Sequence, residues 1–326
     1  MRSRVLGKSG ISVSEIGLGC WQLGGDFGPV GDLQSQHILE AARISGIDFW
    51  DTADVYGGGL SETRIAEFLS SSDTEVTVAT KVGRDGALYP DGYSKEKVRK
   101  NIEGSLKRLG TEAIDLVQLH CVPPEMLKAG DILAWLEDFQ SDGLIRHFGA
   151  SVETIDDALL AMQHPKLTSL QIIFNLFRQD AITRLFPVAE ANDVGIIVRL
   201  PLASGVLAGK MRLDTQFAKS DHRNYNRNGE FFSQGETFSG VPFERALELV
   251  EQIRLMVPDG MSMAQMAMRW LLDQPAVSTV ITGASRPEQV IENASVSALP
   301  PLSSELHARL TYFYWAEIQP SICVPV

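Results

Sequence analysis

Short apolar runs alternate with amphipathic segments along almost the whole chain. Eight runs have the length and composition of buried strands: 15–20, 47–52, 76–82, 114–120, 147–152, 170–175, 195–200 and 279–283. Strands that alternate with helices are typical of parallel α/β architecture, and eight such strands can close into a barrel. The pattern therefore predicts one (β/α)8 TIM barrel domain over residues 1–326.

The amphipathic segments between these runs carry residues that begin and end helices. Ser94 precedes a helical pattern that stops at Gly110, and Asp131 precedes one that stops at Gly143. Ser61 likewise precedes the helical pattern ETRIAEFL. Small polar side chains cap helix N-termini and glycine commonly follows helix C-termini, so these residues predict the helix boundaries.

Three further segments lie outside the simple repeat. Residues 5–13, with LGKSG at their centre, predict an N-terminal β-hairpin that plugs the bottom of the barrel. Residues 203–240 are rich in Gly, Asn, Ser and Asp, and a connection of that length is often a functional lid. Extra helices are predicted after the seventh strand, over 243–256 and 262–273, and at the C-terminus, over 303–317.

Polar residues stand at the ends of four predicted strands. They are Asp51, Lys81, His120 and Ser151, and each follows an apolar stretch. The C-terminal strand ends of such a barrel meet at one mouth, so these side chains are predicted to converge. Tyr56 lies in the loop DTADVYGGG, whose glycines allow a tight path that returns the ring over the mouth.

This combination suits proton transfer to a carbonyl oxygen. A free tyrosine has a pKa of about 10, and the Lys81 ammonium is expected to lower it by stabilising the phenolate. Asp51 would hold the lysine charged, while His120 would orient the carbonyl. Each residue alone also has a structural explanation, as a helix cap, an ion pair or a packing group. Four complementary groups at one mouth favour the catalytic interpretation.

Several motifs resemble those of the aldo-keto reductase family over nearly the whole length. They are GLGCWQLGG, DTADVYGGGLSE, VATKV, IDLVQLH, RHFGASV, LQIIFNLF, PLASGVLAGK and ITGASRPEQVIENA. The resemblance implies a catalytic tetrad of Asp51, Tyr56, Lys81 and His120. It also implies an NADP(H) cofactor that lies extended across the barrel mouth.

The resemblance carries specific cofactor contacts onto this chain. Ser151 and Gln171 would hold the nicotinamide amide, and Arg199 stands where many members place an aromatic ring on the nicotinamide. Arg286, near a helix N-terminus, favours the 2′-phosphate of NADP, although NAD remains open. The complete predicted set is Gly19, Cys20, Trp21, Asp51, Ser151, Gln171, Arg199, Leu200, Leu202, Ser204, Gly205, Lys210, Ser285, Arg286, Gln289, Glu292 and Asn293.

Net charge and cysteine content limit the classes of partner and site that we expect. A formal charge of −12 repels a phosphate backbone, so no nucleic-acid partner is expected. Three widely spaced cysteines predict neither a disulfide framework nor a metal site. No apolar stretch long enough for a membrane span and no secretory signal pattern are found, so a cytoplasmic location is expected. The oligomeric state stays open.

The preferred function is hydride transfer from NADPH to an aldehyde or ketone, with Tyr56 as general acid. One alternative is an NAD-dependent sugar or polyol dehydrogenase. Another is a nucleotide-sensing regulatory subunit, because potassium-channel β subunits resemble the same family. Trp21 is the first candidate to line the substrate pocket, with Phe27, Tyr89 and residues 203–240 after it.

Overall fold

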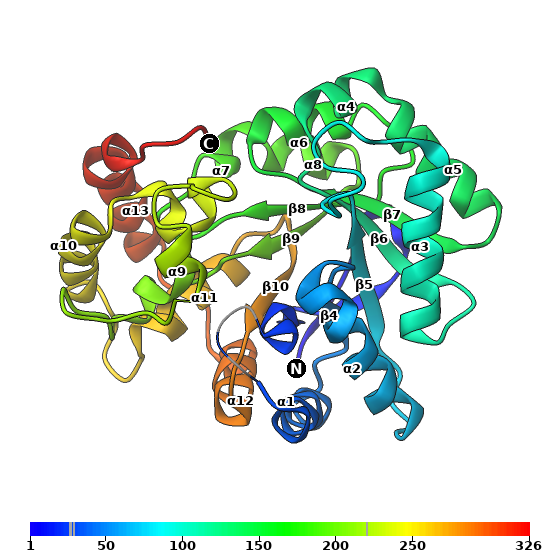
Figure 1. The fold of residues 1–326 in the computed structure, drawn as a ribbon. Coiled ribbons are helices and arrows are strands. Elements are labelled where there is room, and N and C mark those ends of the chain that lie inside the picture. The colour runs from blue at the N-terminus through cyan, green and yellow to red at the C-terminus, as the bar shows by residue number, and fades with distance from the viewer. Residues whose placement is uncertain (26–27, 29, 220) are drawn as a thin grey trace.

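The computed structural model describes residues 1–25, 28, 30–219 and 221–326. Eight parallel strands close a barrel in the order β10-β3-β4-β5-β6-β7-β8-β9 (Figure 1). They are β3 Ile16–Gly19, β4 Phe49–Asp51, β5 Thr77–Val82, β6 Ile114–His120, β7 Ile145–Ser151, β8 Ser169–Ile173, β9 Gly195–Arg199 and β10 Val277–Gly283. The predicted barrel is therefore confirmed, with strand ends that differ by a few residues.

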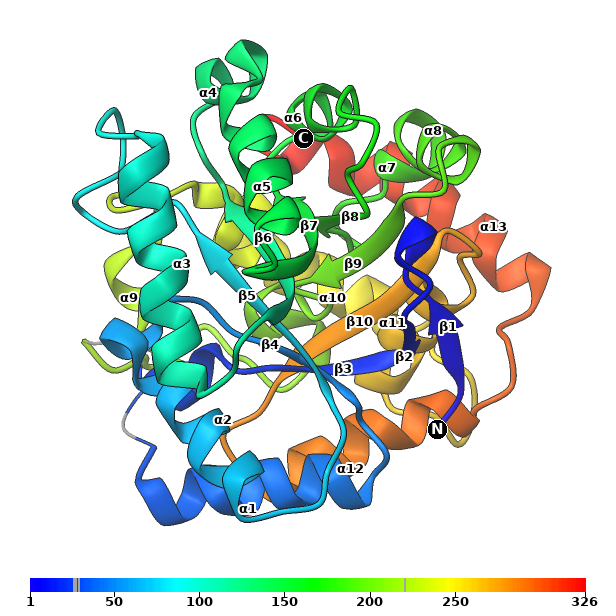
Figure 2. The ribbon, with the colours of Figure 1, turned by 90° about the vertical axis from the view of Figure 1, so that its right-hand side faces the viewer.

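Helices cover the outside of the barrel (Figure 2). Those between the strands are α1 Asp32–Ile44, α2 Leu60–Ser70, α3 Lys95–Leu109, α4 Pro124–Ala129, α5 Asp131–Ser141, α6 Ile155–Ala161, α7 Ala181–Arg184 and α8 Phe186–Ala191. Helix α12, Pro287–Ser295, follows the last strand and packs beside α1 (Figure 1). The apolar side of each layer forms the main hydrophobic core between strands and helices.

Of the three predicted N-terminal caps, the structure confirms Ser94, whereas neither Asp131 nor Ser61 caps its helix. Ser94 caps α3 by accepting a hydrogen bond from the Lys97 amide, and Gly110 ends that helix at φ 66°. Helix α5 begins at Asp131, so Asp131 is the first residue of the helix and not the capping residue before it.

The prediction that Ser61 caps α2 is wrong. The helix begins at Leu60, after Gly59 in a left-handed conformation. The Ser61 hydroxyl is buried and donates to the Cys20 carbonyl at 2.8 Å, while it accepts from the Thr52 hydroxyl at 2.8 Å. A tertiary contact between β3, β4 and α2 thus uses the side chain that local sequence assigned to capping.

The N-terminal hairpin is confirmed. Strands β1 Ser3–Val5 and β2 Ser12–Ser14 pair antiparallel, and the turn between them contains a short 3-10 helix, Gly7–Ser9. Leu6 and Val13 are fully buried, and they pack with five side chains of the barrel interior: Phe49, Ala79, Leu116, Ile197 and Ile281. The hairpin therefore closes the end of the barrel opposite the C-terminal strand ends, as the sequence predicts.

Residues 203–240, here called the lid, follow β9. Their described part contains four short elements: η4 Ala203–Ala208, α9 His222–Tyr225, η5 Gln234–Glu236 and η6 Phe238–Gly240. The extra helices predicted beyond them are present as α10 Phe243–Arg254, α11 Met263–Leu272 and α13 Ser304–Phe313. The last of these continues into a π-helical turn, Tyr314–Ile318.

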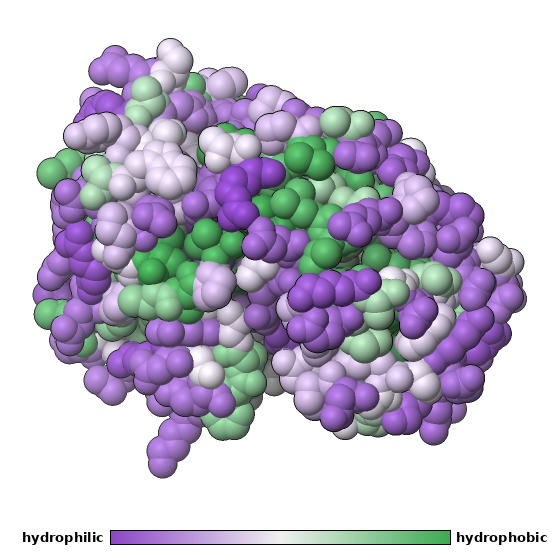
Figure 3. Space-filling view, turned by 90° about the horizontal axis from the view of Figure 1, so that it is seen from above, coloured by the Kyte–Doolittle hydropathy of each residue, from purple (hydrophilic) through white to green (hydrophobic). Residues whose placement is uncertain are grey.

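The outer surface is mixed in character. Seen from above Figure 1, hydrophilic side chains dominate the rim of the molecule, and hydrophobic ones gather in patches nearer its middle (Figure 3). Within the part of the chain that the structure describes, none of the helices combines the length and apolar character that a membrane span requires.

Candidate active site

A buried lysine organises the floor of the barrel mouth. The Lys81 ammonium lies 2.6 Å from Asp51 Oδ2, 2.7 Å from the Thr52 carbonyl oxygen and 3.2 Å from the Tyr56 hydroxyl. Lys81 and Asp51 are both almost completely buried. Three hydrogen bonds and a paired charge compensate the ammonium for the loss of water, so the predicted meeting of phenol, ammonium and carboxylate is present.

The second carboxylate oxygen of Asp51 also accepts hydrogen bonds. Asp51 Oδ1 accepts hydrogen bonds from the side-chain amides of Gln118 at 3.1 Å and Gln171 at 2.7 Å. Gln171 Oε1 in turn accepts from the Ser151 hydroxyl at 3.3 Å. Sequence reasoning missed Gln118, although a polar residue inside the apolar strand IDLVQLH was a usable signal.

The protonation of Tyr56 differs from the sequence-based expectation. Burial raises the pKa of Tyr56 to about 12, and the nearby Asp51 carboxylate adds to the rise. Lys81 lowers the pKa, as expected, but it does not outweigh burial. Burial also lowers the pKa of Lys81, yet Asp51 and Tyr56 more than compensate, so the lysine pKa is raised. The resting state is therefore a neutral phenol beside a charged ammonium.

His120 is a neutral imidazole in this setting. Burial is the main cause that holds the His120 pKa well below its usual value, and the cations Arg84, Lys81 and Arg199 add to the effect. Its ring meets the Tyr56 ring edge to face, with centroids 5.8 Å apart. Its Nδ1 has no hydrogen-bond partner among the described residues. The His120 ring also lines the cavity, so a neutral imidazole can contact a substrate oxygen beside the phenol.

The glycine loop brings Tyr56 into place. Gly57 has φ 59°, and a Cβ there would overlap the backbone of Gly24. Only glycine allows this approach, and it brings Trp21 against Tyr56 with ring centroids 5.8 Å apart. The tight path expected from the sequence is thus observed.

One cavity of about 540 Å³ joins most of the predicted site residues. Its lining includes three residues of the proposed tetrad, with Lys81 buried behind them. From the predicted cofactor set it includes Gly19, Trp21, Asp51, Ser151, Gln171, Arg199, Leu200, Leu202, Ser204, Gly205, Ser285, Gln289 and Asn293. The residues that line the cavity reach from Tyr56 to Gln289 and Asn293 on α12.

Other predicted residues lie elsewhere. Cys20 is fully buried, and burial raises the pKa of its thiol. Lys210, Arg286 and Glu292 are exposed and do not line the cavity. Their cofactor contacts stay predictions.

The residues predicted to line the substrate pocket also differ in whether they line the cavity. Trp21 lines the cavity, whereas Tyr89 is 46% exposed and does not. Phe27 lies outside the described residues.

The segment around Leu202, Ser204 and Gly205, which belong to the predicted cofactor set, has an unusual backbone. Ala203 and Ser204 have φ 47° and 56°, a conformation that non-glycine residues adopt at a cost of about 1–3 kcal/mol and that is concentrated at functional sites. The Ser204 hydroxyl donates to the Glu236 carbonyl at 2.9 Å and accepts from the Phe238 amide at 3.2 Å. In this structure the Ser204 side chain therefore joins the start of the lid to its last part.

The far end of the cavity is formed by the start of α12. Gln289 Oε1 accepts from the amides of Ser285 at 2.9 Å and Arg286 at 3.1 Å, which caps the helix. The side chain of Arg286 is exposed. A cation beside a helix N-terminus can bind a phosphate group.

Sequence reasoning missed four residues that line the substrate half of the cavity. They are Arg84, Cys121, Phe232 and Glu236. Phe232 and Glu236 come from the lid, for which the sequence predicted a function without singling out these residues. Arg84 and Cys121 come from loops after strands, where no local pattern signals a role.

Comparison with known proteins agrees with these observations. Residues 15–314 match the model of the family described as "Aldo/keto reductase family". The chain is 29% identical to an NADH-specific methylglyoxal reductase of Escherichia coli over 90% of this chain and 93% of that protein. It is 29% identical to a probable voltage-gated potassium channel subunit beta of rice over 94% of both proteins.

A solved structure has the same fold as this chain. The glycerol dehydrogenase AKR11B4 from Gluconobacter oxydans superposes with a TM-score of 0.77 and 26% sequence identity, over 99% of this chain and 97% of that one.

Proposed function

The chain belongs to the aldo/keto reductase family of oxidoreductases acting on carbonyl compounds, and from this premise we propose that it reduces aldehydes or ketones with NADPH. The observation that carries the proposal is the contact between Tyr56 and Lys81 at 3.2 Å on the floor of the cavity. The phenol is positioned to donate a proton, and the ammonium is positioned to stabilise the phenolate that remains.

The bound nicotinamide would supply a hydride to the carbonyl carbon. Tyr56 transfers its hydroxyl proton to the carbonyl oxygen, so the products are an alcohol and the oxidised dinucleotide. Lys81 offsets the charge left on the tyrosine oxygen, and Asp51 keeps the ammonium in place at 2.6 Å. His120 donates or accepts through its neutral ring and orients the carbonyl oxygen.

The polar residues along the cavity suit the cofactor. Ser151 donates to Gln171, and Gln171 donates to Asp51, yet both side chains keep acceptor capacity for the nicotinamide amide. Ser285, Gln289 and Asn293 would bind the adenosine half, and Arg286 would pair with a 2′-phosphate. The relative named as NADH-specific makes NADH the alternative cofactor.

The test is a Tyr56→Phe variant assayed with a panel of aldehydes. We expect kcat to fall by about 100- to 10,000-fold, because a general acid is removed. The Kd for NADPH, measured by fluorescence titration, should stay within about threefold, because the lost hydroxyl stabilises the reacting carbonyl rather than the dinucleotide. Retained turnover would remove Tyr56 from its role, and a strong preference for NADH would reverse the cofactor assignment.

A further inference from the structure

Gln118 is a buried amide beside the floor of the cavity. It lies on β6, two residues before His120, and it is fully buried without lining the cavity. In the barrel sheet it is the direct neighbour of Lys81 on β5. A buried amide lowers stability unless its polar atoms find partners, so the contacts of Gln118 indicate its role.

The amide group of Gln118 holds one oxygen of Asp51. Gln118 Nε2 donates to Asp51 Oδ1 at 3.1 Å, and Gln171 Nε2 donates to the same oxygen at 2.7 Å. A carboxylate only accepts hydrogen bonds, so the amide must turn its NH2 group toward it. Gln118 Oε1 is thereby left buried without a partner among the described residues. The contact with Asp51 must offset this cost.

The two amides on Asp51 differ in what else they contact. Gln171 lines the cavity, and it accepts from the Ser151 hydroxyl at 3.3 Å. It is therefore shared between Asp51 and the residues that we propose to bind the nicotinamide. In the part of the chain that the structure describes, the Gln118 side chain bonds Asp51 alone. Gln118 is thus the amide that serves only the carboxylate.

The other oxygen of the same carboxylate holds the lysine of the floor. Asp51 Oδ2 lies 2.6 Å from Lys81 Nζ, which lies 3.2 Å from the Tyr56 hydroxyl. The torsion that turns an aspartate carboxylate has broad minima, so a donor on Oδ1 also fixes the direction of Oδ2. Gln118 therefore acts on Tyr56 through Asp51 and Lys81, without touching the reacting atoms.

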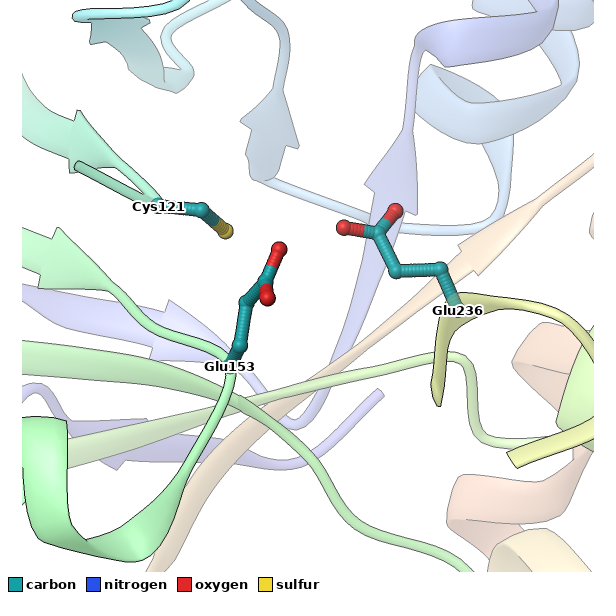
Figure 4. Close-up of side chains that lie close together, drawn as sticks. All are labelled: Cys121, Glu153 and Glu236. Atoms are coloured by element: carbon teal, nitrogen blue, oxygen red, sulfur yellow. The ribbon is translucent and has the colours of Figure 1, made fainter. Parts of the chain in front are cut away.

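The other ionisable groups at the barrel mouth form a separate network. The side chains of Cys121, Glu153 and Glu236 point toward one another, and their ligand atoms lie within 4.8 Å (Figure 4). Glu153 lies 2.6 Å from Arg84, and Glu236 lies 3.5 Å from Arg199. Burial raises the pKa of the Cys121 thiol, which disfavours the thiolate that a metal needs. This group is an ion network rather than a metal site.

Resting on the proposed reductase function, we propose that Gln118 is a positioning residue for the proton transfer. Its amide holds the Asp51 carboxylate, and through it Lys81, in the orientation that stabilises the Tyr56 phenolate. Reacting groups keep their geometry only when their own partners are fixed by such supporting hydrogen bonds. Because Gln118 does not line the cavity, its loss changes turnover rather than dinucleotide binding.

A double-mutant cycle tests the proposal. Gln118→Met removes the amide from a side chain of similar length, and Asp51→Asn removes the carboxylate that the amide holds. Gln118→Met alone should lower kcat for aldehyde reduction by about tenfold, as for the loss of a hydrogen bond to a charged group. It should leave the Kd for NADPH within about twofold. In the Asp51→Asn background the same change should lower kcat by less than about twofold, because the group that Gln118 acts on is gone.

Gln179→Met is the matched control. Gln179 is also a buried amide, its Nε2 lies 3.1 Å from the Leu176 carbonyl oxygen, and its Oε1 has no partner among the described residues. It does not line the cavity. Gln179→Met should leave kcat unchanged in both backgrounds. Equal losses of kcat in Gln118→Met and Gln179→Met would overturn the proposal, because any buried amide would then have the same effect.

The remaining outcomes separate the two proposals. The same fold loss of kcat in both backgrounds would overturn positioning through Asp51, and so would a wild-type kcat in Gln118→Met. Gln118→Leu replaces the methionine variant if that variant does not fold. If Asp51→Asn is too slow to measure, the cycle is read from the midpoint of urea denaturation, where additive shifts would overturn the proposal. Failure of the wild type to reduce any aldehyde with either cofactor would instead defeat the proposed function.

Discussion

The floor of the cavity and its rim use charged residues in opposite ways. On the floor, Lys81 contacts Asp51 at 2.6 Å, and Gln171 contacts the same carboxylate at 2.7 Å. At the rim, both guanidinium contacts of Glu236 are 3.5 Å long. The floor residues lie on barrel strands, whereas Glu236 lies on the lid. This difference indicates that the charged groups next to Tyr56 are held by short contacts between strands, whereas Glu236 of the lid is held by longer ones.

The largest effect should follow from breaking the floor. Lys81→Met leaves the Asp51 carboxylate buried without its partner, which typically costs about 3–5 kcal/mol of unfolding free energy. It also removes the charge that lowers the pKa of Tyr56, so that pKa rises further above about 12. We expect kcat to fall by at least about 100-fold. Urea denaturation and steady-state kinetics measure the two effects.

Lys95→Met is the matched control for that change. Lys95 also lies 2.6 Å from an aspartate, Asp138, but both side chains are largely exposed. Loss of the Lys95 charge should lower the free energy of unfolding by no more than about 1 kcal/mol and should leave kcat unchanged. Equal losses in the two variants would contradict the contrast between a buried and an exposed ion pair.

A smaller effect concerns Asp54, in the loop that carries Tyr56. Burial is the main cause that raises the pKa of Asp54 to about 7, and Glu62 and Asp85 add to it. Asn101 and Arg108 act in the opposite direction. The folded protein thus keeps a proton that the unfolded chain releases near pH 4. This group therefore lowers stability progressively as the pH rises from about 4 to about 7.

Asp54→Asn removes this pH-dependent cost. The free energy of unfolding at pH 8 should rise by up to about 4 kcal/mol, and near pH 4 it should change little. Denaturant titrations at several pH values test the expectation. Asp91→Asn, at an exposed site, is the control and should show no such pH dependence. A variant that is equally stabilised or destabilised at both pH values would contradict the explanation.

The smallest effect is expected at the outer end of the cavity. Arg286 is exposed, so Arg286→Ala should weaken NADPH binding by only about threefold to tenfold, as solvent screens the contact with a 2′-phosphate. The Kd for NADH should not change. Fluorescence titration with both dinucleotides measures this, and a parallel loss for NADH would show that Arg286 does not read the 2′-phosphate.

Residue pattern alone predicted the barrel, its eight strands and the N-terminal hairpin. This was possible because the apolar face of each strand and helix repeats with a fixed period. The convergence of Asp51, Lys81 and His120 was predictable for the same reason, since parallel strands bring their C-terminal ends to one mouth. The cap assigned to Ser61 failed, because a tertiary hydrogen bond to Cys20 competed with a local one.

Other features depended on the tertiary structure. Gln118, Arg84 and Glu236 contact residues that are far away in sequence. Gln118 donates to Asp51, and Arg84 contacts Glu236. The pKa of Tyr56 likewise depends on how deeply the ring is buried, which no spacing of residues reveals. Sequence by itself determined the kinds of reacting groups and the strands that present them. Only the folded chain decided their protonation and their partners, because burial and long-range contacts set both.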